Sequence, residues 1–138
     1  MNQTSQADDS RFILEPRRIH AAIRERIANN QRDIVEEVES ALSEYDIVIV
    51  GLKQNPHVAK ARRLVEAKGL TPQMLIYGSY LGKWRRRNAL KMWTGWPTFP
   101  MVFVKGVLIG GASDLERLTQ SGELSSLLDS NDRISSVR

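Results

Sequence analysis

Few side chains in this sequence could carry out covalent or acid–base chemistry at neutral pH. The 138 residues include two histidines, His20 and His57, and no cysteine. Without cysteine there is no thiolate nucleophile, no disulfide and no thiolate ligand for a metal. The two histidines stand far apart and form no recognisable ligand spacing, so the sequence argues against a metal site. No cysteine or serine is spaced to use His57 as a base, and we interpret it as a solvated side chain.

A cluster of basic and aromatic residues between positions 83 and 96 is a second candidate. It comprises Lys83, Trp84, Arg85, Arg86, Arg87, Lys91, Trp93 and Trp96. Such interleaving can follow phosphates and stack bases, and the net charge of +4 permits it. Nucleic-acid binding through a basic helix at 83–91 is therefore one hypothesis. The sequence disfavours it, because tryptophans at helical spacing are typical of a core and the arginines fan around the helix.

A predicted hairpin near the C-terminal third supplies the frame for any site. Segments 98–104 and 107–109 are β-branched, aromatic and apolar, and Lys105-Gly106 between them suits a tight turn. Pro100 cannot donate to a sheet ladder, so we expect it at the start of the strand or at an edge. Cis bonds are only about 5–6% of X-Pro bonds, so the bare sequence favours a trans bond there.

Upstream of the hairpin, the pattern predicts a strand–helix–strand unit. Segment 46–50 is a continuous apolar run typical of a strand buried on both faces. Asn55-Pro56 opens a helix in the favoured manner, with Asn55 as the N-cap and an apolar stripe that continues to about Lys68. A strand at 74–77 then pairs in parallel with the first.

Two further helices follow from the pattern in the second half of the chain. Segment 81–93 predicts a third helix of the main domain. After Gly110-Gly111, Ser113 is a candidate N-cap with Glu116 three residues on, and the last helix should run over 114–128 with an interruption at Gly122.

The N-terminal part predicts two helices of opposite charge. The first is basic, begins with Pro16 in its first turn and places apolar residues on one stripe; the second, over about 31–44, is acidic. They could pair within one chain or between two chains, which makes a homodimer through the N-terminal helices one hypothesis. We predict a disordered tail at 1–12, a helical extension at 13–30, a main domain at 31–129 and a C-terminal tail at 130–138.

The composition is that of an ordinary globular domain. Hydrophobic residues make up 41% of the chain, and no apolar run is long enough to span a bilayer. The first ten residues are polar and acidic, unlike a signal peptide. We therefore expect a cytoplasmic protein that does not enter membranes.

Several motifs in this order resemble the glutaredoxin family, which has a thioredoxin-like fold. The motifs are W-P-T-F-P at 96–100, V-F-V-K-G at 102–106, G-G at 110–111 and S-G-E-L at 121–124. The closest resemblance is to monothiol glutaredoxins and covers about 32–128. It implies an α/β fold with a mixed four-stranded sheet flanked by helices, a cis bond before Pro100 and a role in cell redox homeostasis.

The resemblance fails at the family's active site. Glutaredoxins carry C-P-Y-C or C-G-F-S after the first strand, and Asn55 and Val58 occupy the two outer positions of that motif here. Asparagine can cap the helix, but it cannot attack a disulfide or bind iron as a thiolate does. The sequence therefore predicts no catalytic residue, and it argues against thiol–disulfide exchange and against an iron–sulfur cluster.

The family's glutathione cleft is the part that the resemblance carries over. By position, the implied glutathione-binding residues are Lys53, Arg87, Thr98, Phe99, Pro100, Gly111, Ala112, Ser113 and Asp114. An extended backbone can pair with the tripeptide, a helix N-terminus binds a carboxylate and arginine grips one with two donors. Ala112-Ser113 stands where the family has Cys-Asp, and Lys53 is one residue out of register.

Three functions follow from these observations. The favoured prediction is a redox-inactive adaptor that binds glutathione or an extended peptide in the old cleft. The alternative is an active monothiol-type redox or iron–sulfur protein, in which Asn55 replaces a natural cysteine or a partner supplies the thiol. The lesser alternative is nucleic-acid binding through the helix at 83–91.

Overall fold

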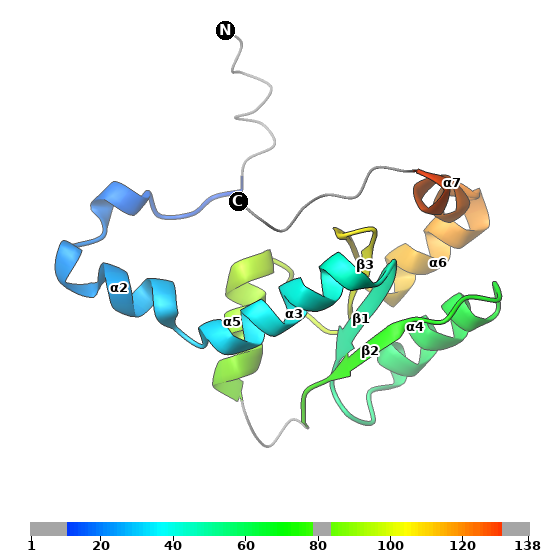
Figure 1. Cartoon of the computed structure of the whole chain (residues 1–138), viewed down its shortest axis with the longest axis horizontal. Coiled ribbons are helices and arrows are strands. Elements are labelled where there is room, and N and C mark those ends of the chain that lie inside the picture. The colour runs from blue at the N-terminus through cyan, green and yellow to red at the C-terminus, as the bar shows by residue number, and fades with distance from the viewer. Residues whose placement is uncertain (1–10, 79–83, 131–138) are drawn as a thin grey trace, which may run out of the picture. The chain divides into compact units, whose positions relative to one another are not determined.

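The computed structural model describes residues 11–78 and 84–130. The chain divides into two units, residues 1–30 and 31–138. In the second unit the strands are β1 (Ile47–Gly51), β2 (Gln73–Ile76), β3 (Met101–Val104) and β4 (Val107–Gly110). Its helices are α3 (Arg32–Glu44), α4 (Pro56–Glu66), α5 (Trp84–Thr94), α6 (Ala112–Ser121) and α7 (Glu123–Asp129). The order of elements along the chain can be followed in Figure 1.

The strands form one mixed sheet in the order β2-β1-β3-β4. β1 pairs with β2 in parallel and with β3 in an antiparallel sense, and β3 and β4 form the antiparallel hairpin. Lys105 and Gly106 make the turn, both with positive φ (53° and 80°), as the tight hairpin turn requires. The parallel unit and the hairpin confirm the predictions from the sequence. The place of β1 between β2 and β3 was not predicted.

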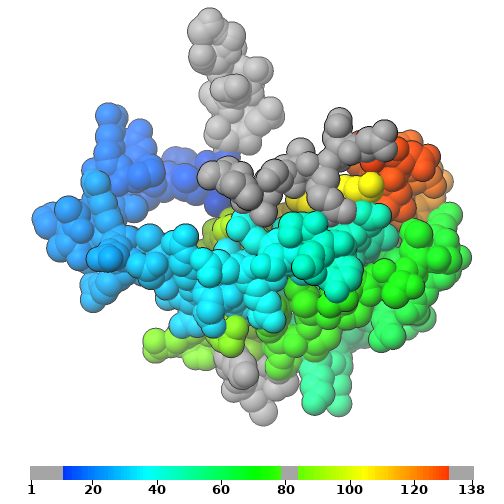
Figure 2. Space-filling model, viewed as in Figure 1, coloured from blue at the N-terminus to red at the C-terminus, as the bar shows by residue number. Residues whose placement is uncertain are grey.

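Side-chain alternation along the central strands creates two cores, one on each face of the sheet. Val48 and Val50 of β1 face α3 and α5, whereas Ile47 and Ile49 face α4 and α6. All five residues of β1 are buried, as the continuous apolar run predicted. Figure 2 shows one of these faces, on which α3, drawn in cyan, covers the sheet.

The bounds of several predicted strands differ from the structure. The first strand begins and ends one residue later than predicted, and the second begins and ends one residue earlier. β3 begins at Met101 rather than at Thr98, because Pro100 has no N–H for the ladder. The bond between Phe99 and Pro100 is cis, as the family resemblance implied. The start of the third helix, predicted at 81, lies outside the described residues.

The last helical segment starts earlier than predicted. Ser113 is not the N-cap: α6 begins at Ala112 with Gly111 as its N-cap, and the Asp114 carboxylate accepts a hydrogen bond from the Gly111 N–H at 2.9 Å. Gly110 has a φ of 116°, which turns the chain directly from β4 into the helix. The predicted interruption at Gly122 is confirmed, because α6 ends there and α7 begins.

The N-terminal unit holds a short 3-10 turn, Pro16–Arg18, and the helix α2, Ala21–Asn29. The predicted basic helix is thus broken at Ile19 and His20, where His20 Nδ1 accepts a hydrogen bond from the Ala22 N–H at 3.0 Å and caps α2. No residue of α2 is buried. The predicted tails, 1–12 and 130–138, fall almost wholly outside the described residues.

Candidate functional site

The first part of the site is the start of α4. β1 ends at Gly51, and Gln54 takes a left-handed φ of 61° that turns the chain into the helix. Asn55 then caps α4, with its Oδ1 accepting hydrogen bonds from the N–H of His57 at 2.8 Å and of Val58 at 3.1 Å. Asn55 is buried, with 7% of its surface exposed. The N-cap predicted from the Asn-Pro pair is therefore confirmed.

This geometry shows what Asn55 can and cannot do. The positive end of a helix dipole and its free amides favour a negative or electron-rich atom at the N-cap. An amide oxygen fills that place as a neutral acceptor, and it has no proton to lose and no electron pair that attacks a disulfide. At this position the chain offers helix capping rather than nucleophilic chemistry.

A cleft with a volume of 490 Å³ opens beside Asn55. Its lining combines the α4 start, the segment before β3, the α6 start and one residue of α5: Leu52, Asn55, His57, Lys91, Trp96, Pro97, Thr98, Phe99, Pro100, Gly111, Ala112, Ser113 and Asp114. These stretches are far apart in sequence, and the sheet brings them together because β1, β3 and β4 are neighbours.

The cleft contains most, but not all, of the residues that the resemblance singled out. Thr98, Phe99 and Pro100 line it from one segment, and the four residues 111–114 line it from another. The two predicted cations are not in the described lining. Lys53 borders a separate groove, and Arg87 is a buried residue of α5 with 8% of its surface exposed.

Lys91 and Trp96 are residues of the cleft that the sequence reasoning missed. Lys91 lies one helical turn after Arg87, and its Nζ stands 5.7 Å from the centre of the Phe99 ring. The spacing of four residues was the available signal, since residues i and i+4 share a helix face. The buried Trp96 indole N–H has no hydrogen-bond partner among the described residues, and its nitrogen lies 3.9 Å from where a Cβ at Gly111 would sit.

The start of α6 supplies hydrogen-bond donors to the cleft. The first intrahelical bond runs from the Leu115 N–H to the Gly111 carbonyl at 3.0 Å, so the amides of Ala112, Ser113 and Asp114 have no acceptor within the helix. The dipole of α6 adds positive potential at the same point. A carboxylate is the ligand group that such a helix start binds best.

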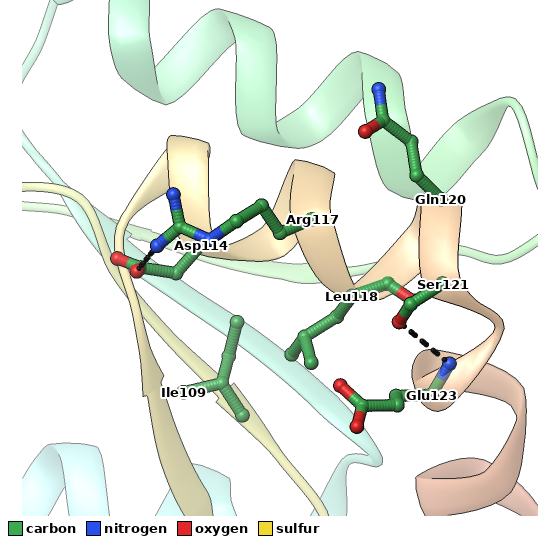
Figure 3. Close-up of a pocket in the computed structure, with 7 residues that line it drawn as sticks. All are labelled: Ile109, Asp114, Arg117, Leu118, Gln120, Ser121 and Glu123. Atoms are coloured by element: carbon green, nitrogen blue, oxygen red, sulfur yellow. Dashed lines mark hydrogen bonds and ion pairs between the residues drawn. The ribbon is translucent and has the colours of Figure 1, made fainter.

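The Asp114 carboxylate, in contrast, is already occupied. One oxygen accepts from the Gly111 N–H and the other meets the Arg117 guanidinium. Figure 3 shows this ion pair at the edge of a second hollow, where Ile109 of β4 and Leu118 of α6 point toward each other. Because Arg117 offsets its charge, Asp114 opposes an incoming anion less than a free carboxylate would.

Tyr77 is the titratable residue with a clear electrostatic signature, and it belongs to the opposite face of the sheet. Burial raises the pKa of its phenol, and the nearby Glu37 raises that pKa further. Tyr77 packs against the core formed by α3 and α5. Tyr77 therefore belongs to that core and is not among the described residues that line the cleft.

Residues 11–78 and 84–130 contain no group of three histidine, aspartate or glutamate side chains arranged to hold a metal ion. No helix within the same ranges has the length and apolar character needed to cross a membrane.

Comparison with known proteins decides the family. The chain is 41% identical over 98 residues to a glutaredoxin-like protein of Dictyostelium discoideum, an alignment that covers 71% of this chain and 80% of that protein. The chain belongs to the glutaredoxin family. It is also 37% identical over 70 residues to the Legionella pneumophila protein named probable monothiol glutaredoxin GrlA, covering 51% of this chain and 75% of that one. No family model matches the sequence.

The fold agrees with this glutaredoxin assignment. The structure of a buckwheat glutaredoxin–glutathione complex matches with a TM-score of 0.63 over 72% of this chain and 91% of that one, at 19% identity. This likeness confirms the predicted thioredoxin-like class, a mixed four-stranded sheet flanked by helices. The chain is thus a glutaredoxin without cysteine, and its activity must be argued from its own cleft.

Proposed function

We propose that this glutaredoxin-family protein is a binding protein without thiol chemistry, and that its cleft holds glutathione or an extended peptide. One observation carries the proposal. Asn55 cannot act as a thiol, yet the cleft beside it still brings together the residues that a ligand would contact. The helix start that would stabilise a thiolate is capped by an amide oxygen. The neighbouring segments still present donors, an apolar floor and a cation.

The cleft offers a complementary group for each part of a short acidic peptide. The free amides at the start of α6 suit one carboxylate, and the Lys91 ammonium suits a second. The segment before β3 offers backbone groups for an extended ligand at Thr98 and Phe99. The buckwheat neighbour was solved with glutathione, a tripeptide with two carboxylates, which supports this ligand class for the present chain.

The alternative, an active redox or iron–sulfur protein, requires a thiolate that the chain lacks. Thiol–disulfide exchange begins with attack by a thiolate on a disulfide, and iron–sulfur clusters of this type are held by cysteine sulfur. Either activity would need a thiol from another molecule at the position of Asn55, where the amide oxygen already takes two hydrogen bonds. We therefore favour binding without chemistry.

The nucleic-acid alternative is weakened by how α5 uses its basic residues. Arg86 pairs with Asp33 of α3 at 3.3 Å, and Arg87 is buried. Lys91 faces the cleft beside Phe99, while Arg85 stacks over the Trp84 ring at 5.1 Å. Charges turned in several directions do not form the continuous basic track that single-stranded nucleic acid follows.

The test is a titration with two ligands, reduced glutathione and S-methylglutathione, followed by amide chemical shifts. Both ligands should bind equally, with saturable shifts at Thr98, Phe99, Gly111 and Ser113, because binding here needs no thiol. Shifts with reduced glutathione alone would favour the redox alternative. The absence of shifts at millimolar ligand would show that the cleft binds neither, and would refute its glutathione role.

A glycine substitution sharpens this test. A Cβ at Gly111 would meet the Pro100 carbonyl oxygen at 3.6 Å and Trp96 at 3.9 Å, which are ordinary contact distances. Gly111→Ala should therefore fold normally but place a methyl group in the lining, and we expect it to weaken glutathione binding by about tenfold, or ~1.4 kcal/mol. Thr119→Ala, on the same helix outside the described lining, is the matched control and should bind as the unmodified chain does.

A further inference from the structure

A second groove lies along β2, and it has a different chemistry from the cleft. It has a volume of 430 Å³ and is lined by β2, α4 and the loop between β1 and α4: Leu52, Lys53, Gln54, Asn55, Val58, Ala59, Arg62, Arg63, Glu66, Met74 and Ile76. Leu52 and Asn55 line both the cleft beside α6 and this groove. The remaining lining residues of the groove belong to surfaces that the proposed glutathione site does not use.

The groove carries an excess of positive charge. Its lining contains three basic side chains, Lys53, Arg62 and Arg63, against the single carboxylate of Glu66. That carboxylate pairs with Arg62 at 3.0 Å. Lys53 and Arg63 make no ion pair with any carboxylate in the described part of the chain, and both are exposed. Two cations beside one groove are therefore available to an acidic ligand.

The same groove includes an open edge of the sheet. β2 is an outer strand of the described sheet. The Tyr77 N–H donates inward to the Gly51 carbonyl at 2.9 Å, and strand alternation then turns the backbone groups of Met74 and Ile76 outward. Both side chains line the groove, and Ile76 is 42% exposed. An unpaired edge of this kind is a template for another strand.

We infer that this groove binds an extended acidic peptide of a protein partner, which adds as a strand to β2. Backbone hydrogen bonds to Met74 and Ile76 would hold the strand, and every second side chain would face α4. Acidic residues at those positions reach Lys53 and Arg63, with their methylene stems over the apolar floor. The remaining side chains of the peptide would point to the opposite face of the sheet, beside Leu75, where β-branched residues fit best.

A peptide fits this groove better than a nucleic acid does. Its floor is apolar, with Val58, Met74 and Ile76, and its described lining includes no aromatic side chain on which a base could stack. The sheet edge offers donors and acceptors in the spacing of a strand, which a sugar–phosphate chain does not match. The inference is independent of the proposed glutathione site, because the groove and the cleft share only a border.

The first experiment measures binding of a fluorescent peptide of about eight residues in which valine and glutamate alternate, a typical strand length. A peptide of the same composition with the residues in blocks is the control, since it cannot place its glutamates on one face. The alternating peptide should bind several-fold more tightly. Equal affinity for both peptides, or tighter binding of single-stranded DNA of equal charge, would overturn the inference.

The second experiment assigns the binding to this groove. Arg63→Glu replaces an attraction with a repulsion, and we expect it to lower affinity by roughly fivefold to tenfold. Lys68→Glu makes the same charge change at an exposed residue outside the described lining and should lower affinity far less. An equal loss in both variants would reveal a long-range charge effect and would exclude a site at this groove.

The third experiment tests strand addition directly. In a strand, the N–H groups of alternate residues point to the same edge, so only the valines or only the glutamates can donate to β2. Two peptides are therefore compared, one N-methylated at every valine and one N-methylated at every glutamate. One of them should fail to bind, and the other should bind as the unmodified peptide does. Loss with both sets, or with neither, would show that the peptide does not pair with β2. Competition with excess reduced glutathione should have no effect, which separates this groove from the cleft.

Discussion

The Asn55 side chain accepts two hydrogen bonds at the start of α4. The family resemblance implies a cysteine at this position. The two donors belong to the backbone, so their positions do not depend on which side chain caps the helix. They would stabilise a thiolate in the same way, since backbone amides and the helix dipole lower a thiol pKa. The start of α4 therefore offers two features that would lower the pKa of a thiol placed at position 55.

The variant Asn55→Cys tests this account. We expect the new thiol to have a pKa at least about one unit below the ordinary value of about 8.5, because the thiolate is favoured by the amides of His57 and Val58. Ultraviolet absorbance of the thiolate as a function of pH measures it. Ala59→Cys, exposed one turn later on α4, is the control and should titrate near the ordinary value. Equal pKa values for the two thiols would contradict the account.

The sequence allowed some single-residue predictions and not others. Asn55 as an N-cap could be predicted, because the Asn-Pro pair is a local signal that acts within one turn of helix. The spacing of four residues indicated that Lys91 and Arg87 share a helix face, but not that Lys91 lines the cleft and Arg87 does not. That difference depends on the rotation of α5 about its own axis, which the packing of Leu90 against the sheet core sets. A cluster of basic residues shows that cations are present on a helix, but not which one faces a ligand.

The position of α4 depends on a close approach to the end of β1. A Cβ at Gly51 would overlap the Val58 side chain and lie 3.1 Å from Val58 Cγ1. Val58 is buried, with 5% of its surface exposed, and packs in the core between α4 and the sheet. Glycine at the end of β1 therefore allows the start of α4, and with it Asn55, to lie close to the sheet.

A double-mutant cycle measures this contact. Gly51→Ala should lower the free energy of unfolding by about 1–3 kcal/mol, the typical cost of overpacking a core. Val58→Ala alone should lower it through lost burial, but in the double variant the shortened side chain makes room for the new methyl group. The double variant should thus be more stable than the sum of the two changes predicts, as measured by urea denaturation. Simple additivity would show that the two residues are not in conflict.

Elements were predicted well where a periodic pattern is long, and their ends were predicted less well. The apolar run of β1 and the stripe of α4 each encode burial directly. Ser113 was wrong as the cap of α6, because the helix start is set by the turn at Gly110 and by the hydrogen bond from Gly111 to Asp114. The turn and the hydrogen bond both depend on the residue at which β4 ends in the sheet, and the local sequence does not specify that residue.

At the scale of the whole molecule, the 41% identity to a glutaredoxin-like protein shows the family, and the mixed sheet with a core on each face shows the fold. Of the motifs that revealed the family, W-P-T-F-P and the second glycine of G-G line the cleft, whereas V-F-V-K-G contributes Val102, Phe103 and Val104 to the two cores. The N-terminal unit is different. It has charged and apolar residues in a helical pattern, but a pattern of this kind does not identify the surface that covers the apolar side.

The N-terminal unit leaves several large apolar side chains exposed, which single soluble chains tend to limit to small patches. They are Phe12, Ile13, Leu14, Ile23 and Ile27. The homodimer hypothesis from the sequence rests on the opposite charges of the N-terminal helix and α3. We therefore predict that the full chain self-associates, and that Ile23→Glu combined with Ile27→Glu shifts it toward the monomer.

Sedimentation equilibrium over a range of protein concentrations measures this shift. Ala28→Glu is the matched control, because it adds a charge to the same helix at a small side chain, and it should leave the association intact. The interaction should also weaken with salt if charge pairing between α2 and α3 contributes, whereas a purely apolar contact would be insensitive or slightly strengthened. A monomeric chain at every concentration would rule out the homodimer and leave pairing within one chain, the other alternative that the sequence left open.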